Sequence, residues 1–163
     1  MKTKSNKINL TRLIAAIVIC QLAGAIGSAF TFPAISTWYA TLQKPAFSPP
    51  NWLFGPVWIL LYTLMGISAY LVWEKGINNK EVRHAVTAFG AQLALNTLWS
   101  ILFFGLKSPL LGLICIIALW LAIVYTTIKF GGISKQAGWL LGPYIIWVTF
   151  AAILNFSIWQ LNS

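Results

Sequence analysis

The side chains with the clearest chemical character are tryptophans, tyrosines and amides that recur three or four residues apart, on one face of a helix. Three such faces are predicted: Trp58, Tyr62, Met65, Ala69 and Trp73; Gln92, Asn96, Trp99 and Phe103; and Tyr144, Trp147, Ala151 and Asn155. An amide facing lipid is costly, so we expect Gln92, Asn96 and Asn155 to point inwards. Aromatic walls with a few polar groups are typical of a pocket for a flat apolar ligand. Amides that only join neighbouring helices are the alternative.

Residues suited to acid–base or metal chemistry are scarce. The sequence has no Asp, its two acidic residues Glu74 and Glu81 fall in one polar link, and its one histidine, His84, is expected to be interfacial. Cys20 and Cys115 fall inside apolar runs, where buried free thiols are more common than a disulfide. The sequence therefore predicts no metal site, no required cofactor and no acid–base catalysis. A proton-driven transporter is also disfavoured, because no ionisable group lies in the middle of a span.

The elements that must position these faces are long apolar helices. The chain is 59% hydrophobic and 8% charged, whereas a soluble domain carries about 25% charged residues. Five charge-free runs each have about the 20 residues that a membrane-spanning helix needs. The prediction is an all-α membrane protein, a bundle of five transmembrane helices forming a single domain over residues 1–163. The helices are expected at about 13–32, 54–73, 84–106, 110–128 and 137–161.

Prolines and glycines mark the expected ends of these helices. The first helix is expected to stop before Pro33 and the fourth to end before Gly131-Gly132. Pro143 falls inside the fifth and predicts a kink. Pro56 fits the first turn of the second helix, where its missing donor does no harm.

The first loop, residues 33–53, is unusual in composition. The stretch from Trp38 to Trp58 holds four of the seven prolines and three of the nine tryptophans. A residue before proline is driven towards extended backbone, so Lys44, Ser48 and Pro49 are expected to be extended. The loop is too aromatic for a solvated linker. We expect a structured lid that lies on or dips into the bundle, with Trp38, Pro45, Pro49 and Pro50 as its defining residues.

The basic residues predict an orientation in the membrane. Of the 11 Lys and Arg, nine fall at the N-terminus and in the second-to-third and fourth-to-fifth links, and two, Lys44 and Lys107, fall on the other side. The positive-inside rule then places the N-terminus in the cytoplasm and the C-terminus outside. Because the charges are spread over loops, the net charge of +9 indicates a bilayer partner and not nucleic acid.

The first apolar run is interpreted as a retained helix and not a signal peptide. It follows a basic segment, but it is longer than an ordinary signal-peptide core. The N-terminus also lacks the Arg-rich, Ser-rich composition of an organellar presequence, which favours a bacterial cell membrane.

Several motifs together resemble the TspO/MBR family, the tryptophan-rich sensory proteins of bacteria and the translocator protein (peripheral benzodiazepine receptor) of mitochondria. The resemblance covers about residues 33–155. Its most specific pieces are Trp38-Tyr39 with Lys44-Pro45, Ser48-Pro49-Pro50, Gly55-Pro56-Val57-Trp58, Tyr62, Gln92, Asn96-Thr97-Leu98-Trp99-Ser100, Phe103-Phe104, Trp139-Leu140-Leu141, Pro143-Tyr144, Trp147, Ala151 and Asn155. Any one piece is weak, and the joint pattern is very specific.

The resemblance implies a five-helix bundle, commonly a homodimer, with a ligand cavity closed by the first loop. Family ligands include porphyrins and haem-related tetrapyrroles, sterols in some members, and synthetic benzodiazepine-site compounds. The implied ligand-binding residues are Tyr39, Trp58, Tyr62, Asn96, Trp99, Trp147 and Ala151. Light-dependent porphyrin breakdown is also ascribed to the family, which would make Trp58 and Trp147 catalytic in an indole-mediated photo-oxidation of the porphyrin.

Two positions depart from the family pattern. Many members carry an acidic residue in the fourth helix, where this chain has Cys115. The family's cholesterol motif needs a Tyr followed by Lys or Arg near the end of the fifth helix. The stretch Leu154-Asn155-Phe156-Ser157-Ile158-Trp159-Gln160 has neither, which argues against high-affinity sterol binding.

Three functions stay open on the sequence alone. The first is a membrane receptor or sensor for porphyrins, with a transport or regulatory role. The second is a light-dependent porphyrin-degrading enzyme, and the third is a sterol- or lipid-binding or scaffold protein. Small residues on the third helix, Ala88, Ala91 and Ala94 with Gly90, allow close helix approach and suggest a homodimer interface.

Overall fold

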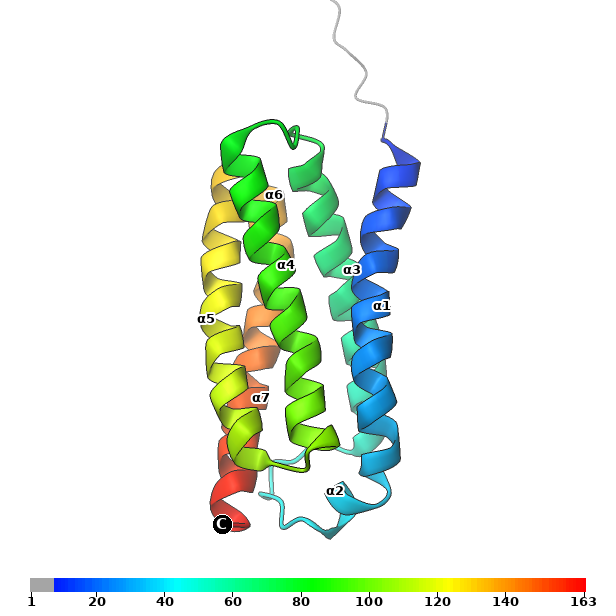
Figure 1. Cartoon of the computed structure of the whole chain (residues 1–163), viewed down its shortest axis with the longest axis vertical. Helices are drawn as coiled ribbons and strands as arrows, with labels where there is room; N and C mark the ends of the chain where they lie inside the picture. Colours follow the sequence, from blue (N-terminus) through cyan, green and yellow to red (C-terminus); the bar gives the residue numbers. More distant parts are fainter. Residues whose placement is uncertain (1–7) are drawn as a thin grey trace, which may run out of the picture.

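Five long helical segments form a bundle in the computed structural model, which describes residues 8–163 (Figure 1). They are α1 (Leu10–Ile35), α3 (Phe54–Trp73), α4 (Lys80–Ser100) continued by the π-helix η2 (Ile101–Gly105), α5 (Pro109–Ile133), and α6 (Lys135–Leu140) followed by α7 (Gly142–Leu161). Each segment is long and apolar enough to cross a membrane. The predicted fold class is confirmed, and the chain is an integral membrane protein.

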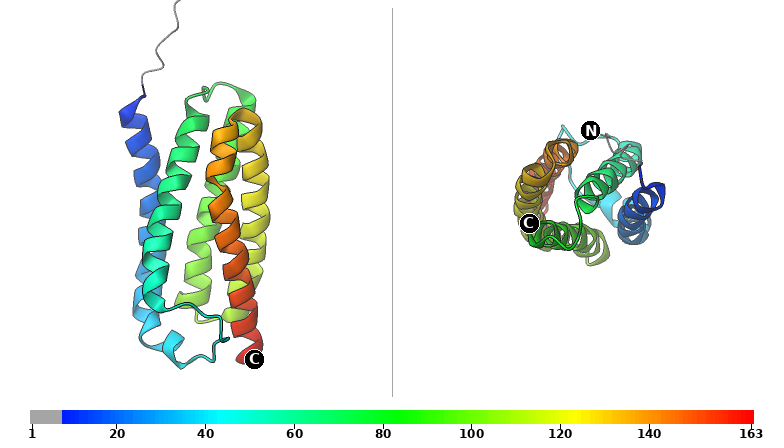
Figure 2. Two further views of the ribbon diagram at one scale, coloured as in Figure 1. Left: turned by 180° about the vertical axis from the view of Figure 1, so that it is seen from behind. Right: turned by 90° about the horizontal axis from the view of Figure 1, so that it is seen from above.

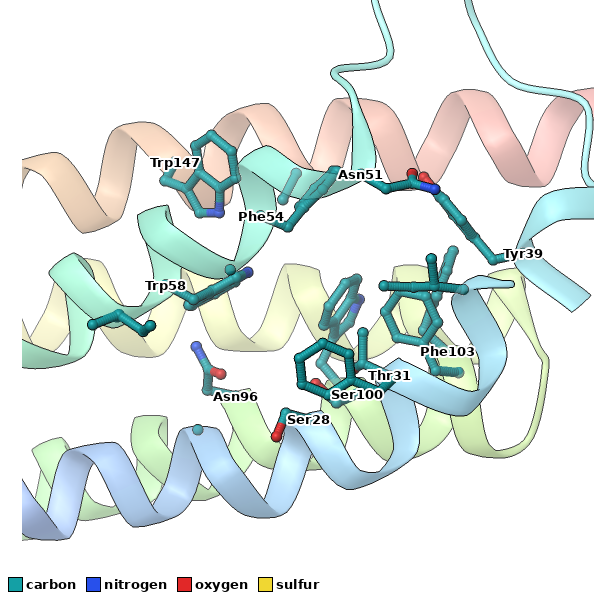
Figure 3. Close-up of a pocket in the computed structure, with 18 of the residues that line it drawn as sticks. Ser28, Thr31, Tyr39, Asn51, Phe54, Trp58, Asn96, Ser100, Phe103 and Trp147 are labelled. Atoms are coloured by element: carbon teal, nitrogen blue, oxygen red, sulfur yellow. The ribbon is translucent and has the colours of Figure 1, made fainter. Parts of the chain in front are cut away.

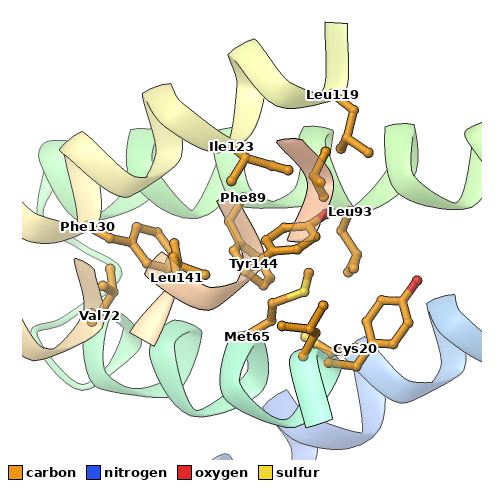
Figure 4. Close-up of a cluster of buried hydrophobic side chains, with 14 of the residues drawn as sticks. Cys20, Met65, Val72, Phe89, Leu93, Leu119, Ile123, Phe130, Leu141 and Tyr144 are labelled. Carbon is orange, nitrogen blue, oxygen red and sulfur yellow. The ribbon is translucent and has the colours of Figure 1, made fainter. Parts of the chain in front are cut away.

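The helices are arranged in a ring in which α1 lies beside α3 and α4, α5 lies between α4 and α7, and α6 packs on α3 (Figures 1 and 2). The ring encloses an apolar core in which Met65, Val72 and Phe130 have no exposed surface (Figure 4). Large apolar side chains such as Leu22 and Ile146 are instead exposed on the outside. An apolar outer surface is what a bundle needs when its surroundings are lipid.

The first helix does not stop before Pro33 as expected, because α1 continues to Ile35 with Pro33 inside it. Proline removes one backbone donor and crowds the carbonyl four residues earlier. Here the helix runs only two residues further, so little regular structure is lost. The hydroxyl of Thr37 then donates to the carbonyl of Pro33 over 2.7 Å.

The Gly131-Gly132 pair does not break the chain, and α5 runs through it to Ile133. The reason is packing against the next helix. A Cβ added at Gly138 would lie 2.8 Å from the Cα of Gly131, so these glycines let α6 approach α5 closely. The discontinuity expected at Pro143 is present, since α6 ends at Leu140 and Pro143 lies in the first turn of α7.

The third membrane helix starts earlier than expected, at Lys80, because Asn79 caps it. The Asn79 side-chain oxygen accepts a hydrogen bond from the backbone N–H of Glu81 over 2.8 Å, which satisfies one of the free donors of a helix start. At its other end the helix widens into η2, which the sequence did not indicate.

The first loop crosses the far end of the bundle and is partly helical, while Lys44, Ser48 and Pro49 lie outside its helical turns. It holds the single turn α2 (Trp38–Thr41) and the 3-10 turn η1 (Asn51–Leu53), and Pro50 between them is extended. Gln43 fastens the loop to the end of α7. Its backbone N–H donates to Asn162 Oδ1 and its carbonyl accepts from Asn162 Nδ2, each over 2.9 Å.

At the opposite end, α1 and α3 are held together by polar contacts. The guanidinium of Arg12 bonds the carboxylate of Glu74 over 3.0 Å and lies 5.5 Å from the Trp73 ring centre. Cys20 and Cys115 are both buried and free, as the sequence predicts.

Candidate functional site

A cavity of about 350 Å³ lies in the loop-side half of the bundle. Its wall includes side chains from α1, α2, η1, α3, α4, η2 and α7, so elements from most of the chain meet there (Figure 3). The volume lies in the range of small-molecule sites, about 300–1,000 Å³.

The structure brings together all seven residues that the sequence marks as ligand-binding. Each lines this one cavity: Tyr39, Trp58, Tyr62, Asn96, Trp99, Trp147 and Ala151. The four lid residues Trp38, Pro45, Pro49 and Pro50 are not part of its wall. Trp38 instead packs edge-on against Phe103, with ring centres 5.6 Å apart, so it supports the wall from behind.

A chain of hydrogen bonds joins three helices at the inner end of the cavity. The hydroxyl of Tyr62 donates to Asn96 Oδ1 over 2.6 Å, and Asn96 Nδ2 donates to the hydroxyl of Tyr144 over 2.6 Å. Tyr144 in turn donates to Gln92 Oε1 over 2.9 Å. The amides point inwards as predicted, with Asn96 2% and Gln92 1% exposed. The network fixes the aromatic side chains around the cavity as well as joining helices.

A second polar pair supports the wall nearer the loop. The indole N–H of Trp99 donates to Asn155 Oδ1 over 3.0 Å, and Asn155 Nδ2 donates to the carbonyl of Pro109 over 2.8 Å. Asn155 thus orients Trp99 and holds the start of α5. Its role at the cavity is to position a ring.

Flat ring faces make up much of the remaining wall. Trp58 and Tyr62 lie 5.5 Å apart at an interplanar angle of 31°, and Trp99 stacks on Phe103 at 5.3 Å. Trp147 meets Phe54 edge-on. Its indole N–H is buried and has no hydrogen-bond partner among the described residues, so it is free to bind an acceptor on a ligand.

Sequence reasoning missed the contribution of α1. Five of its wall residues are small or polar, and two are large and apolar: Gln21, Gly24, Ala25, Ser28 and Thr31, then Phe32 and Ile35. The sequence signal is the adjacent pair of small residues Gly24-Ala25, which ordinary helix packing explains equally well. A Cβ added at Gly24 would lie 2.4 Å from the Tyr62 ring. The glycine therefore makes room for Tyr62 to reach Asn96.

Phe104 also lines the cavity and lies, like Phe103, in the π-helix η2. In η2 the turn is wider, with the backbone N–H of Leu106 bonding the carbonyl of Ile101 over 2.8 Å. Both phenyl rings are buried beside Tyr39. Single π turns occur frequently at functional sites.

Tyr39 closes the loop end of the cavity. Its side chain is 5% exposed, and the ammonium group of Lys44 lies 4.8 Å from its ring centre. Burial raises the pKa of the Tyr39 hydroxyl above its ordinary value of 10.0. The phenol is therefore protonated at neutral pH.

No His, Cys, Asp or Glu side chain lines the cavity among residues 8–163. No group of three His, Cys, Asp or Glu side chains is close enough to hold a metal ion there. The wall offers hydroxyls, amides, an unpartnered indole N–H and aromatic faces. These groups suit binding and orientation of an apolar ligand.

Comparison with known proteins gives one consistent result. The model of the TspO/MBR family matches residues 16–160. The chain is 49% identical over 157 residues to the tryptophan-rich protein TspO of Archaeoglobus fulgidus, covering 96% of this chain and 100% of the relative. It is 47% identical to the protein of the same name from Chlorobaculum tepidum, covering 96% and 99%.

Similarity extends to animal proteins at lower identity. The human translocator protein is 38% identical over 139 residues, covering 84% of this chain and 82% of the relative. Since the family model spans most of the chain and these relatives match it nearly from end to end, this membrane protein belongs to the TspO/MBR family.

Proposed function

We propose that this protein is a membrane receptor or sensor that binds porphyrins and related tetrapyrroles in the cavity, in a transport or regulatory role. The observation that carries the proposal is the wall itself. The rings of Trp58, Trp99 and Trp147 border one cavity together with the buried amide of Asn96. A tetrapyrrole is a broad, flat, apolar ring system with polar groups at its edge, and ring stacking with a few hydrogen bonds is the recognition it requires.

The expected contacts differ between the two ends of the ligand. The free indole N–H of Trp147 supplies a donor for a carbonyl or carboxylate oxygen. The stacked pair Trp99 and Phe103 supplies a flat face. No cofactor is required, since the porphyrin is the ligand and the protein's own groups orient it.

The test is a titration of purified protein with protoporphyrin in the dark, following tryptophan fluorescence. Saturable quenching is expected in the wild type, with weaker binding in Asn96→Ala and Trp147→Phe. Trp120→Phe is the matched control, because the Trp120 indole donates to Thr149 and lies outside the cavity. Binding that ignores both cavity substitutions would move the site elsewhere, and no quenching at all would refute the receptor function.

A second candidate is light-dependent porphyrin breakdown, supported by the positions of Trp58 and Trp147 in one wall. Illumination of the loaded protein in air should then produce a new chromophore. The product should disappear in Trp58→Phe and Trp147→Phe but not in Trp120→Phe. Bound porphyrin that is stable in light would exclude this candidate and leave the receptor.

We also propose a homodimer formed through α4. Ala91 and Ala94 are exposed on its outer face, and Gly90 beside them has open space around it. Small exposed residues on a spanning helix let a second helix approach closely. This face lies away from the cavity, so dimer formation leaves the ligand wall intact.

The proposed orientation places the N-terminus in the cytoplasm of a prokaryotic cell. Lys75, Lys80, Arg83 and Lys129 all lie at or beyond the ends of α3, α4 and α5 on the side where α1 begins (Figure 1). Lys2, Lys4 and Lys7, which also support it, lie outside the described residues. The two TspO relatives named above are from prokaryotes.

A further inference from the structure

The exposed part of the cavity wall lies on one side of the bundle. Its exposed residues all belong to α1, η1 or α3: Ala25, Phe32, Asn51, Gly55 and Ile59. Every wall residue from α4, η2 and α7 is buried or half-buried. The cavity therefore reaches the surface between α1 and α3, and we call this opening the α1–α3 portal.

The other end of the cavity is shut by packed side chains. Tyr39, Phe103 and Ile158 are 5%, 2% and 1% exposed and form one hydrophobic cluster beneath the loop. The Gln43–Asn162 pair fastens the loop above them. A ligand arriving from water at this end would have to break both the pair and the cluster.

The seam between α1 and α3 is closely packed from the N-terminal end of α1 as far as Gly24, which lies against the Tyr62 ring. There α1 and α3 are so close that a Cβ added at Gly66 would lie 2.5 Å from the Cα of Ile17 and clash with it. Further along, Gln21 Nε2 donates to the Ile59 carbonyl and to the Thr63 hydroxyl, each over 3.0 Å. On the loop side of Gln21, no side-chain hydrogen bond joins α1 to α3 within residues 8–163.

The rim of the portal lies inside the membrane-spanning stretches. Ala25 and Phe32 belong to the span Leu10–Ile35, and Ile59 belongs to the span Asn51–Trp73. Phe32 is 71% and Ile59 62% exposed, so most of the rim is apolar and would border lipid, while its polar member Asn51 lies at the very start of its span. Exposed apolar groups at this depth are stable in contact with acyl chains.

We propose that ligands enter and leave the cavity sideways, from the bilayer through the α1–α3 portal, and not from water past the loop. The inference rests on the proposed receptor function and narrows its ligand class to molecules that dissolve in the membrane. The hydrogen bonds of Gln21 to α3 mark the end of the portal nearer the N-terminus of α1. Gly55 lies at the start of α3 and leaves the loop-side end of the portal free of a side chain.

The experiment measures protoporphyrin association and dissociation rates with the protein in lipid nanodiscs. Gly55→Leu is the test variant, because a Cβ there meets nothing within 4 Å and the added side chain can extend over the portal. Gly132→Leu is the matched control, since Gly132 also has open space and lies outside the cavity wall. A second variant combines Gln43→Cys with Asn162→Cys, so that oxidation of the two thiols to a disulfide locks the loop to the end of α7.

Both rates should fall together by about tenfold or more in Gly55→Leu, as a raised barrier on the route requires. They should be unchanged in Gly132→Leu and in the oxidised loop-locked protein. Wild-type rates in Gly55→Leu, or loading abolished by the loop lock, would overturn the portal and leave the receptor standing. Absence of saturable binding in the wild type would overturn both.

Discussion

Gly24→Ala offers a sharp test of how the cavity is built. Ordinary van der Waals contact begins at 3.4 Å and the new Cβ would lie 2.4 Å from the Tyr62 ring, so the ring must retreat by about 1.0 Å. If the ring moves away from Asn96, the 2.6 Å hydrogen bond from the Tyr62 hydroxyl to Asn96 Oδ1 would lengthen to about 3.6 Å and be lost. Moving towards Asn96, the ring would press on the rest of the network.

The energetic cost follows from these two outcomes. A hydrogen bond between membrane helices contributes about 0.6 kcal/mol and at most about 1.7. Overpacking a tight site costs about 1–3 kcal/mol. The better helix propensity of alanine offsets about 0.5–1 kcal/mol. We therefore expect Gly24→Ala to lower the free energy of unfolding by up to about 1 kcal/mol if the hydrogen bond is lost, and by up to about 2.5 kcal/mol if the site is overpacked.

The assay is equilibrium unfolding in mixed detergent micelles, followed by tryptophan fluorescence. Gly132→Ala is the control, because a Cβ at Gly132 meets nothing within 4 Å, and it should match or slightly exceed wild type. Tyr62→Leu should suppress much of the effect of Gly24→Ala, because the shorter side chain removes the clash. If Gly24→Ala unfolds together with its control, the proposed dependence of the network on Gly24 is refuted.

Three further changes test other parts of the molecule. Ala91→Leu should shift the protein–detergent mass towards that of a monomer, and an unchanged dimer would count against the α4 interface. Arg12→Ala removes an ion pair whose side chains are 48% and 30% exposed, so it should cost under about 1 kcal/mol of stability, and less in high salt; a larger, salt-independent loss measured by the same unfolding assay would contradict this. Asn162→Ala should speed hydrogen exchange at the Gln43 amide by roughly 5–30-fold, the factor for 1–2 kcal/mol; mass spectrometry of that peptide checks it, and unchanged protection would show that the pair does not hold the loop.

The membrane helices could be predicted from sequence because length and charge are sufficient to indicate a span. Their ends were less predictable, because the same residue has different effects in different surroundings. Pro33 looked like a stop but lies two residues before the end of α1. Gly131 looked like a break, but Gly138 packs against its backbone. Which effect dominates depends on the neighbouring helix, and the sequence pattern does not contain that information.

The cavity wall was predictable where it is aromatic. Trp58, Asn96 and Trp147 each belong to a set of aromatic or amide side chains that recur at helical spacing along their own helix. All three line the cavity. The α1 side was missed because small residues such as Ala25 and Ser28 are common in any membrane helix. Their role in the cavity wall depends on Tyr62 lying opposite them on α3, and only the folded chain shows this.

The π-helix η2 makes the length of the chain critical at one point. A π turn holds about one residue more than an α turn over the same stretch, so η2 amounts to a residue inserted into an otherwise regular helix. Deleting Ile101 or Leu102 would restore an α turn and rotate Phe103 and Phe104 by about 100° relative to Trp99. Trp99 and the Phe103–Phe104 pair would then no longer face the same cavity. A relative that keeps the same cavity can therefore differ from this chain by substitutions in this helix. We expect it to have no insertion or deletion in the turn that corresponds to η2.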